Sequence, residues 1–210
     1  MKNIMFIAPP AAGKGTQAEL ITSKYNIPHI STGDILREIA KEDSEIGNYV
    51  AETMASGKLV KDEITYQLIE DRLAKEDCKN GFIIDGFPRN LEQAIEYDKI
   101  LAKLGYEVGN VILLDIEPKT LEKRITGRRT CLACGASYHV TAKKPLKEGV
   151  CDVCGADLVQ RKDDCEETIK SRLEVYHNQT APVLEYFGKQ GIVKNIPGVG
   201  EISEIFANIK

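Results

Sequence analysis

The segment from Ile7 to Glu19, IAPPAAGKGTQAE, contains residues whose types and spacing suggest anion binding. Small residues followed by a lysine at the start of a helix present backbone N–H groups, a positive helix end and an ammonium group to an anion. The sequence departs twice from the pattern G-x-x-x-x-G-K-[ST], because Ala8 replaces the first glycine and Gly15 replaces the hydroxyl residue. The segment predicts a phosphate-binding loop, with an ordinary strand-to-helix turn as the alternative. The candidate residues are Pro9, Pro10, Gly13, Lys14, Gly15 and Thr16.

A carboxylate and several arginines could complete such a site. Asp85 ends the apolar run FII, where it could meet a hydrated Mg²⁺ ion beside the phosphates of a nucleotide, although Asp85, Gly86 and Pro88 could also form only a turn. The planar guanidinium of arginine can bind phosphate oxygens in pairs and keeps its charge when buried. These residue types favour phosphoryl transfer. The arginines are Arg89, Arg124, Arg128, Arg129, Arg161 and Arg172.

Four cysteines form two C-x2-C pairs, CLAC and CDVC, a spacing typical of zinc knuckles. Four thiolates close a tetrahedral shell and leave no position open for catalysis, so the spacing predicts a structural zinc ion. One alternative is a pair of disulfides, which a reducing cytosol disfavours. Another is a zinc ribbon for nucleic acid, which the acidic segment KDDCEE disfavours. The predicted ligands are Cys131, Cys134, Cys151 and Cys154.

The other cysteines and the three histidines show no comparable spacing. Cys78 and Cys165 lie outside both pairs and are interpreted as bystanders, although Cys165 could be accessible. His29 and His177 make no site with the cysteines. His139 follows Tyr138 and either lines a cleft or is an ordinary packed or surface histidine.

The elements that must position these residues alternate between strands and helices. Continuous apolar runs, NIMFIA, GFIIDGF and NVILLDI, are typical of strands buried on both faces of a parallel sheet, and GIVKNI is a weaker fourth. Helical spacing occurs in KGTQAELITSKY, EITYQLIEDRLAK, NLEQAIEYDKILAKLG and TLEKRITGR, and EETIKSRLEVYHNQTAPVLEYF reads as a long helix. The alternation predicts an α/β fold.

Two stretches interrupt this alternation and are interpreted as inserts in a single core. Residues 31–60 read as a small helical insert that begins with a capping residue. The second insert, residues 127–164, is rich in Cys, Gly, Lys and Pro and has few long apolar side chains. Burial of apolar surface could hardly fold it alone, so metal binding would supply folding free energy. Both inserts are candidate moving parts.

Composition limits the class of protein. The chain has 210 residues, enough for one domain with inserts or for two small domains. Its formal net charge of -4 gives no general attraction to nucleic acid. No apolar run reaches the ~18 to 20 residues of a membrane span, and the start MKNIMFIAPP passes into a loop rather than a cleavable signal. We expect a cytosolic protein whose partners are neither nucleic acid nor membrane.

Six segments, in this order, resemble the bacterial adenylate kinases with a long lid: GKGTQA, STGDILR, DGFPRN with a following Gln, RITGRR, YHV, and RKDDCEET with a following Arg. The resemblance spans nearly the whole chain and implies a P-loop NTPase-like α/β fold with a five-stranded parallel sheet flanked by helices. Residues 1–30, 61–126 and 165–210 would form the core. Residues 31–60 would bind the nucleoside monophosphate, and residues 127–164 would form a zinc-stabilised lid over ATP.

The implied activity is reversible, Mg²⁺-dependent transfer of the terminal phosphoryl group of ATP to AMP by a monomer, which gives two ADP and serves adenine nucleotide homeostasis. Catalysis would rest on Lys14, Asp85, Arg89, Arg124, Arg128, Arg161 and Arg172. ATP would be bound by Ala11, Ala12, Gly13, Lys14, Gly15, Thr16, Arg124, Arg128, Ser137, Tyr138 and Gly200. AMP would be bound by Thr32, Arg37, Lys58, Leu59, Val60, Gly86, Phe87, Pro88, Arg89, Gln93, Arg161 and Arg172.

Chemistry supports two of these roles independently. Arg37 and Arg89 can hold an acceptor phosphate, and the amide of Gln93 can bind an adenine edge through its donor and acceptor. Ala8 and Ala11 depart from the family, which has glycines there, and each methyl group would cost ~1 to 2 kcal/mol if its backbone were left-handed. The alternatives are a kinase for another monophosphate, such as UMP or CMP, and a zinc-stabilised module that senses nucleotides without turnover.

Overall fold

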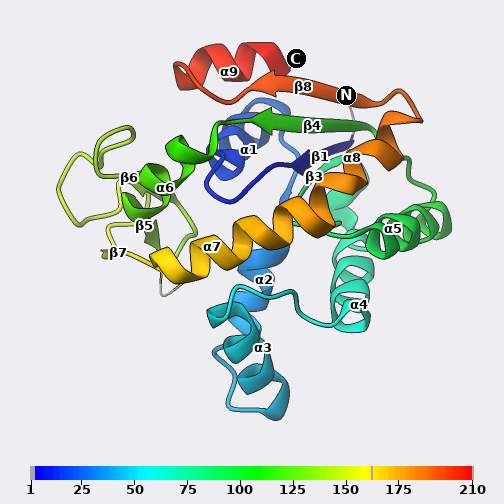
Figure 1. Ribbon diagram of the computed structural model, residues 1–210, viewed down its shortest axis with the longest axis horizontal. Coiled ribbons are helices and arrows are strands. Elements are labelled where there is room, and N and C mark those ends of the chain that lie inside the picture. The colour runs from blue at the N-terminus through cyan, green and yellow to red at the C-terminus, as the bar shows by residue number, and fades with distance from the viewer. Residues whose placement is uncertain (1–2, 162, 210) are drawn as a thin grey trace.

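The computed structural model describes residues 3–161 and 163–209, so residues 1–2 and 210 of the predicted core and residue 162 of the predicted lid lie outside the description. A five-stranded parallel sheet with the strand order β2-β3-β1-β4-β8 forms the centre of the molecule (Figure 1). This confirms the expected fold class. The strands are β1 (Asn3–Ile7), β2 (His29–Ser31), β3 (Phe82–Asp85), β4 (Asn110–Asp115) and β8 (Val193–Pro197).

Helices cover both faces of the sheet because the inner strands are apolar on both sides. In β1, Met5 and Ile7 pack in one buried cluster with α4, α5 and α8, whereas Ile4 and Phe6 pack in another with α1, α6 and α9. This period of two is the usual alternation of side chains along a strand. The helices are α1 (Lys14–Tyr25), α4 (Asp62–Leu73), α5 (Leu91–Leu104), α6 (Pro118–Thr126), α8 (Ala181–Gly188) and α9 (Ile202–Ile209), and a 3₁₀ turn, η1 (Glu76–Cys78), follows α4.

The predicted insert at residues 31–60 contains two helices, α2 (Thr32–Ile39) and α3 (Glu45–Ala55). Its first residue, Ser31, ends strand β2, and the Ser31 hydroxyl caps α2 by accepting a hydrogen bond from the Asp34 N–H. A second serine, Ser44, caps α3 in the same way. The insert has a small apolar core of its own, which includes Leu36, Val50 and Val60.

The predicted lid contains a three-stranded antiparallel sheet with the order β6-β5-β7. Its strands are short: β5 (Arg128–Cys131), β6 (Ser137–His139) and β7 (Leu158–Val159). The buried cluster of the lid consists of Cys131, Tyr138 and Cys151. The apolar core of the lid is therefore very small, which agrees with the expectation that apolar burial alone would not fold it.

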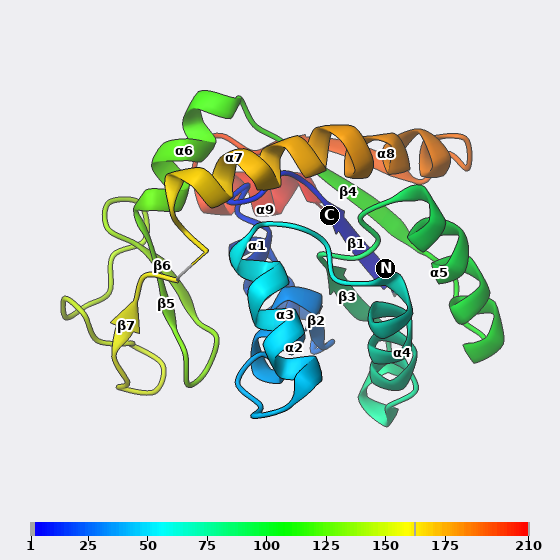
Figure 2. The same cartoon turned by 60° about the horizontal axis from the view of Figure 1, so that its bottom comes forward.

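A long helical stretch returns the chain from the lid to the core. Sequence spacing predicts one helix there, and the structure divides it into α7 (Glu166–Val175), one π turn named η2 (Tyr176–Thr180) and α8. Beside the small insert, Thr168 and Ser171 of α7 donate hydrogen bonds to the carbonyls of Ala55 and Ser56. Figure 2 shows α7 running from the lid past α2 and α3, so one helix touches both inserts. No helix in the described part of the chain is long and apolar enough to cross a membrane.

Candidate active site

A cleft of about 1540 Å³ opens at the carboxyl edge of the sheet and is lined by residues of both the small insert and the lid. Most of the predicted site residues line it, although they come from distant parts of the chain. Those that line it are Ala11, Ala12, Gly13, Lys14, Gly15, Thr16, Arg37, Asp85, Gly86, Pro88, Arg89, Arg124, Arg128, Ser137, Tyr138, Arg161, Arg172 and Gly200. Thr32, Lys58, Leu59, Val60, Phe87 and Gln93 lie outside its lining.

The loop between β1 and α1 has the conformation of an anion-binding turn. Gly13 precedes α1 with φ 93°, and Ala11 has φ 60°, so both lie in the left-handed region. The Lys14 ammonium donates hydrogen bonds to the carbonyls of Ala8 (3.2 Å) and Pro9 (3.3 Å), which places it inside the loop. The first N–H groups of α1 have no partner within their own helix, so they are available to phosphate oxygens.

Asp85 lies opposite this loop at the end of β3. One carboxylate oxygen is 3.9 Å from Lys14 Nζ and the other is 3.4 Å from His29 Nε2. Burial alone would raise the pKa of Asp85, but the positive charge of Lys14 and the contact with His29 lower it to about 2. Burial also lowers the pKa of Lys14 to about 8, against the opposing effect of Asp85. Asp85 is therefore ionised at neutral pH. It can coordinate a cation or accept a hydrogen bond from the water bound to one.

Arginines of the lid and α7 are held by carboxylates. Arg128 makes a two-pronged ion pair with Asp164, whose side chain is fully buried, and its Nε lies 2.8 Å from Oδ2. Arg172 Nη1 lies 2.8 Å from Asp163 Oδ2. Asp164 is buried and Asp163 is partly buried, and each carboxylate fixes the direction of its guanidinium and compensates its charge. The two adjacent aspartates thus orient two arginines toward one cleft.

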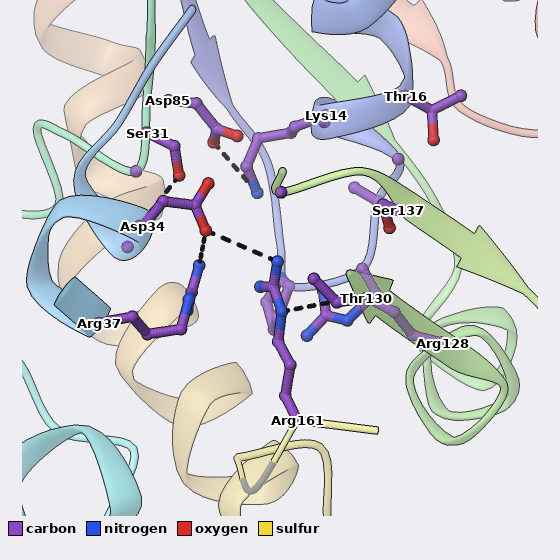
Figure 3. A pocket seen from close by; sticks show the side chains of 18 of the residues that line it. Lys14, Thr16, Ser31, Asp34, Arg37, Asp85, Arg128, Thr130, Ser137 and Arg161 are labelled. Carbon is purple, nitrogen blue, oxygen red and sulfur yellow. Dashed lines mark hydrogen bonds and ion pairs between the residues drawn. The ribbon is translucent and has the colours of Figure 1, made fainter. Parts of the chain in front are cut away.

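The lid and the small insert meet at Asp34 (Figure 3). Asp34 Oδ1 lies 2.5 Å from Arg37 Nη2 and 3.7 Å from Arg161 Nη2. Arg161 also donates from Nε to the Thr130 hydroxyl of β5 at 3.0 Å. Burial, with nearby arginines contributing, lowers the pKa values of Arg161 and Arg172 to about 10, so both stay charged at neutral pH.

Two further arginines reach the cleft from the core. Arg124 donates to the carbonyls of Ala12 and Gly198, which joins α6 to the loop. Arg89 Nε donates to the Gly86 carbonyl at 2.7 Å. Gly86 has φ 83°, and a Cβ there would lie 2.6 Å from the hydroxyl of Thr32, so this position requires glycine. The neighbouring Phe87–Pro88 peptide bond is cis.

The four lid cysteines form one cluster, in which all four sulfur atoms lie within 4.8 Å of one another. Cys131 Sγ is 3.4 Å from Cys154 Sγ, and Cys134 Sγ is 3.5 Å from Cys151 Sγ, so each short contact joins the two knuckles. These separations are too long for a disulfide bond of about 2.05 Å. They approach the edge of about 3.8 Å expected for a tetrahedron with zinc–sulfur bonds of about 2.3 Å. The cluster is therefore consistent with structural zinc.

Comparison with known proteins agrees with this geometry. The family profile described as "Adenylate kinase" matches residues 6–192. The adenylate kinase of Caldicellulosiruptor bescii is 50% identical over 201 residues, which cover 96% of this chain and 94% of that protein. Those of Caldanaerobacter subterraneus subsp. tengcongensis and Clostridium tetani are each 48% identical over 207 residues, with 99% of this chain covered and 94% and 96% of theirs. The chain belongs to the adenylate kinase family.

Membership in this family makes the protein an ATP:AMP phosphotransferase, as the sequence motifs predict. The adenylate kinase family uses Mg-ATP, and Asp85 offers the oxygen ligands that Mg²⁺ prefers. Asp85 is ionised, faces the cleft and lies beside the loop, so the residues present fit a hydrated Mg²⁺ ion.

Several of the residues assigned to AMP are engaged in contacts within the protein in this adenylate kinase structure. Gln93 is buried, its oxygen accepts from the Arg89 N–H at 2.7 Å, and its nitrogen donates to Asp62 at 2.6 Å. Thr32 is buried and donates to the Asp85 carbonyl. Phe87 packs edge-on against two tyrosines, and Val60 lies in the core of the small insert. Lys58 is exposed and Leu59 is partly buried.

Sequence reasoning missed the carboxylates of this adenylate kinase site. Asp34, Asp163 and Asp164 pair with the predicted arginines, yet none was assigned a role from the sequence. Two signals could have found them. Asp163 and Asp164 stand next to each other in the arginine-containing segment RKDD, and Asp34 stands three residues before Arg37 on one helix face.

Proposed function

We propose that this chain transfers the terminal phosphoryl group of Mg-ATP to AMP, reversibly, and gives two ADP. The observation that carries the proposal is that Lys14 and all six arginines assigned to the site, from the loop, the core, the small insert, the lid and α7, line one cleft. Among the described residues, the whole lining contains ten cationic and six acidic side chains. The cations stay in excess when Asp164, the partner of Arg128, is included, which leaves positive charge for phosphate oxygens. Cations gathered in this way would neutralise the charge on a phosphoryl group during transfer.

We assign one end of the cleft to ATP. The backbone N–H groups of residues 11–16 would hold its phosphates, with Lys14 at the transferred group. Arg124 and Arg128 would contact the same phosphates, and Ser137, Tyr138 and Gly200 would lie near the adenosine. This assignment is supported by the left-handed turn at Gly13 and by the place of these residues in the lining.

We assign the opposite end to AMP. Arg37 and Arg89 would hold the acceptor phosphate, while Arg161 and Arg172 would lie near the group in flight. The segments 58–60 and 86–88, with Thr32 and Gln93, would border the AMP site, and of these residues Gly86 and Pro88 line the cleft itself. For Gln93 to bind adenine through its amide, the hydrogen bond to Asp62 would have to be exchanged for one to the base.

Catalysis would rest on position and charge. Asp85 would hold a hydrated Mg²⁺ ion, which supplies charge neutralisation at the phosphates when bound. The arginines would hold donor and acceptor in line, and no covalent intermediate is required. Closure of the lid and the small insert would exclude water, which competes with AMP as acceptor.

We further propose that residues 31–60 and 127–164 act as separate moving domains on the core. Zinc on the four cysteines would hold the lid together, because the lid has little apolar core. We propose a cytosolic monomer on the resemblance of the chain to the family.

Replacement of Lys14 tests the loop assignment. We expect Lys14→Ala to lower kcat at least about a hundredfold, as loss of one transition-state donor does elsewhere, while the unfolding curve stays cooperative. Steady-state ADP formation and thermal unfolding measure the two effects. Lys24→Ala, at the exposed end of the same helix, is the matched control and should keep the normal rate. Near-normal turnover of Lys14→Ala would contradict the assignment.

A further inference from the structure

We propose that Glu19 is a lid-positioning residue, whose carboxylate holds the lid against α1 at the end of the cleft assigned to the adenosine of ATP. The identity of the nucleotide at that end rests on the proposed function, whereas the contact itself is a feature of the fold. Glu19 and its partners Lys143 and Ser137 all line the cleft.

Two donors from the lid converge on this one carboxylate. Lys143 Nζ lies 2.5 Å from Glu19 Oε2, and the pair is an ion pair between a lid loop and a core helix. The backbone N–H of Ser137, the first residue of β6, donates to Glu19 Oε1 at 3.4 Å. The carboxylate therefore contacts the lid at two points, which restrains rotation of the lid as well as its distance from α1.

The lid residues that meet Glu19 are held firmly in place. His139 donates its backbone N–H to the Lys143 carbonyl at 2.9 Å, which closes the turn after β6. Inside the turn, His139 Nδ1 accepts from the N–H groups of Thr141 and Ala142, both at 3.1 Å. The Lys143 ammonium also lies 5.5 Å from the ring centre of Tyr138. Lys143 is thus presented by a fixed turn.

Glu19 is equally well fixed on the core side. It lies three residues after Thr16 on α1, so it shares a helix face with the last residue of the phosphate loop. Its neighbours Ala18 and Ile21 are buried against the sheet, which immobilises the helix. Across the described residues, the side-chain hydrogen bonds and ion pairs that join α1 to the lid all end on Glu19.

The strength of this contact suits a lid that opens in every cycle. The side chains of Lys143 and Glu19 are 32% and 39% exposed, so water and salt screen the pair. Exposed pairs of this kind change an equilibrium by about two- to fivefold. Glu19 therefore favours the closed lid without locking it, and ADP could still leave.

A kinetic test separates the ATP side from the AMP side. We expect Glu19→Gln and Lys143→Met each to raise the KM for Mg-ATP about two- to fivefold and to leave the KM for AMP unchanged. If lid opening limits turnover, each variant should keep or raise kcat. The double variant should be no worse than either single variant. The charge-exchanged variant Glu19→Lys/Lys143→Glu should have a lower KM for Mg-ATP than both singles.

An ion pair elsewhere provides the matched control. Lys103 and Glu70 join α5 to α4 outside the cleft lining, so Glu70→Gln should change neither KM. An unchanged KM for Mg-ATP in Glu19→Gln, or an equal rise in both KM values, would overturn the proposal. The exchanged variant restores an ion pair with its charges reversed, and a merely structural role would gain nothing from that restoration. Failure of the exchanged variant to improve on the singles would therefore also overturn the proposal.

Amide hydrogen exchange tests the contact without turnover. In the nucleotide-free, metal-loaded protein, Glu19→Gln should speed exchange about two- to fivefold in residues 137–143, and Glu70→Gln should not. Equal exchange in Glu19→Gln and the unmodified protein would overturn the lid contact. If the unmodified protein forms no ADP from Mg-ATP and AMP, the proposed function fails, and the exchange result still decides the role of Glu19.

Discussion

Ala8 and Ala11 lie three residues apart in the phosphate-loop segment and differ in backbone conformation. Among the described non-glycine residues, only Ala11 and Asn26 have positive φ, and Ala11 has φ 60°. Ala8 is buried in the apolar cluster beside α1. The expectation that a methyl group strains a left-handed backbone therefore applies to Ala11 and not to Ala8. At Ala11 the strain is about 1 to 2 kcal/mol.

The strain predicts opposite effects for two glycine substitutions. Ala11→Gly should raise the free energy of unfolding by about 0.5 to 1 kcal/mol, because relief of the strain exceeds the extra entropy of glycine in the unfolded chain. Ala8→Gly, the matched control, should lower it by about 0.5 to 1 kcal/mol. Urea unfolding measures both. A destabilising Ala11→Gly would mean that the loop holds its alanine without strain.

The charge of Lys14 predicts a pH dependence. Burial lowers the pKa of Lys14 to about 8, whereas the pKa of Asp85 is about 2. Raising the pH through 8 should therefore neutralise Lys14 in the free enzyme, leave Asp85 ionised and lower kcat/KM for Mg-ATP. Lys14→Arg keeps its charge and should not show a fall centred at this pH. A kcat/KM profile that stays flat from pH 7 to 10 in the unmodified protein would contradict this role of the ammonium.

The lid is the element whose stability depends most on its cysteines. Its three strands are two to four residues long, and its buried cluster contains two of the four cysteines. Strands this short carry little stability of their own. Cross-linking of both knuckles by one metal ion would replace the missing apolar core.

Loss of one cysteine should therefore weaken the lid before the core. We expect Cys131→Ser to lower the temperature of thermal inactivation and to speed proteolytic cleavage within residues 128–161, with a much smaller effect on the rate at low temperature. Cys165→Ser, exposed and outside the cluster, is the control. Metal analysis that finds no zinc in the unmodified protein would remove the basis of this prediction.

At the scale of the whole molecule, the long buried elements follow from the sequence. The apolar runs predict β1, β3, β4 and β8, and helical spacing predicts α1 over the residues that form it. The strand β2 has three residues, too few for a periodic pattern, and it forms because β3 offers it a parallel partner. The lid strands are also too short for a periodic pattern, so the sequence does not predict them.

The site follows from the sequence only in part. The cationic residues and the four cysteines are predictable because their chemistry or spacing is distinctive. Their partners are not, since Asp34 meets Arg161 only when two inserts approach across the cleft. The engagement of both ends of the Gln93 amide likewise depends on residues brought together by folding.

The most direct test of the central claim is the initial rate of ADP formation from Mg-ATP with AMP, UMP, CMP or GMP as the acceptor, in protein of known zinc content. We predict rapid turnover with AMP and rates lower by orders of magnitude with the other three. A preference for UMP or CMP would contradict the assignment of the acceptor. Tight binding of ATP and AMP without turnover would contradict the enzyme itself, and would mean that the loop with Ala8 and Ala11 holds phosphate but does not catalyse transfer.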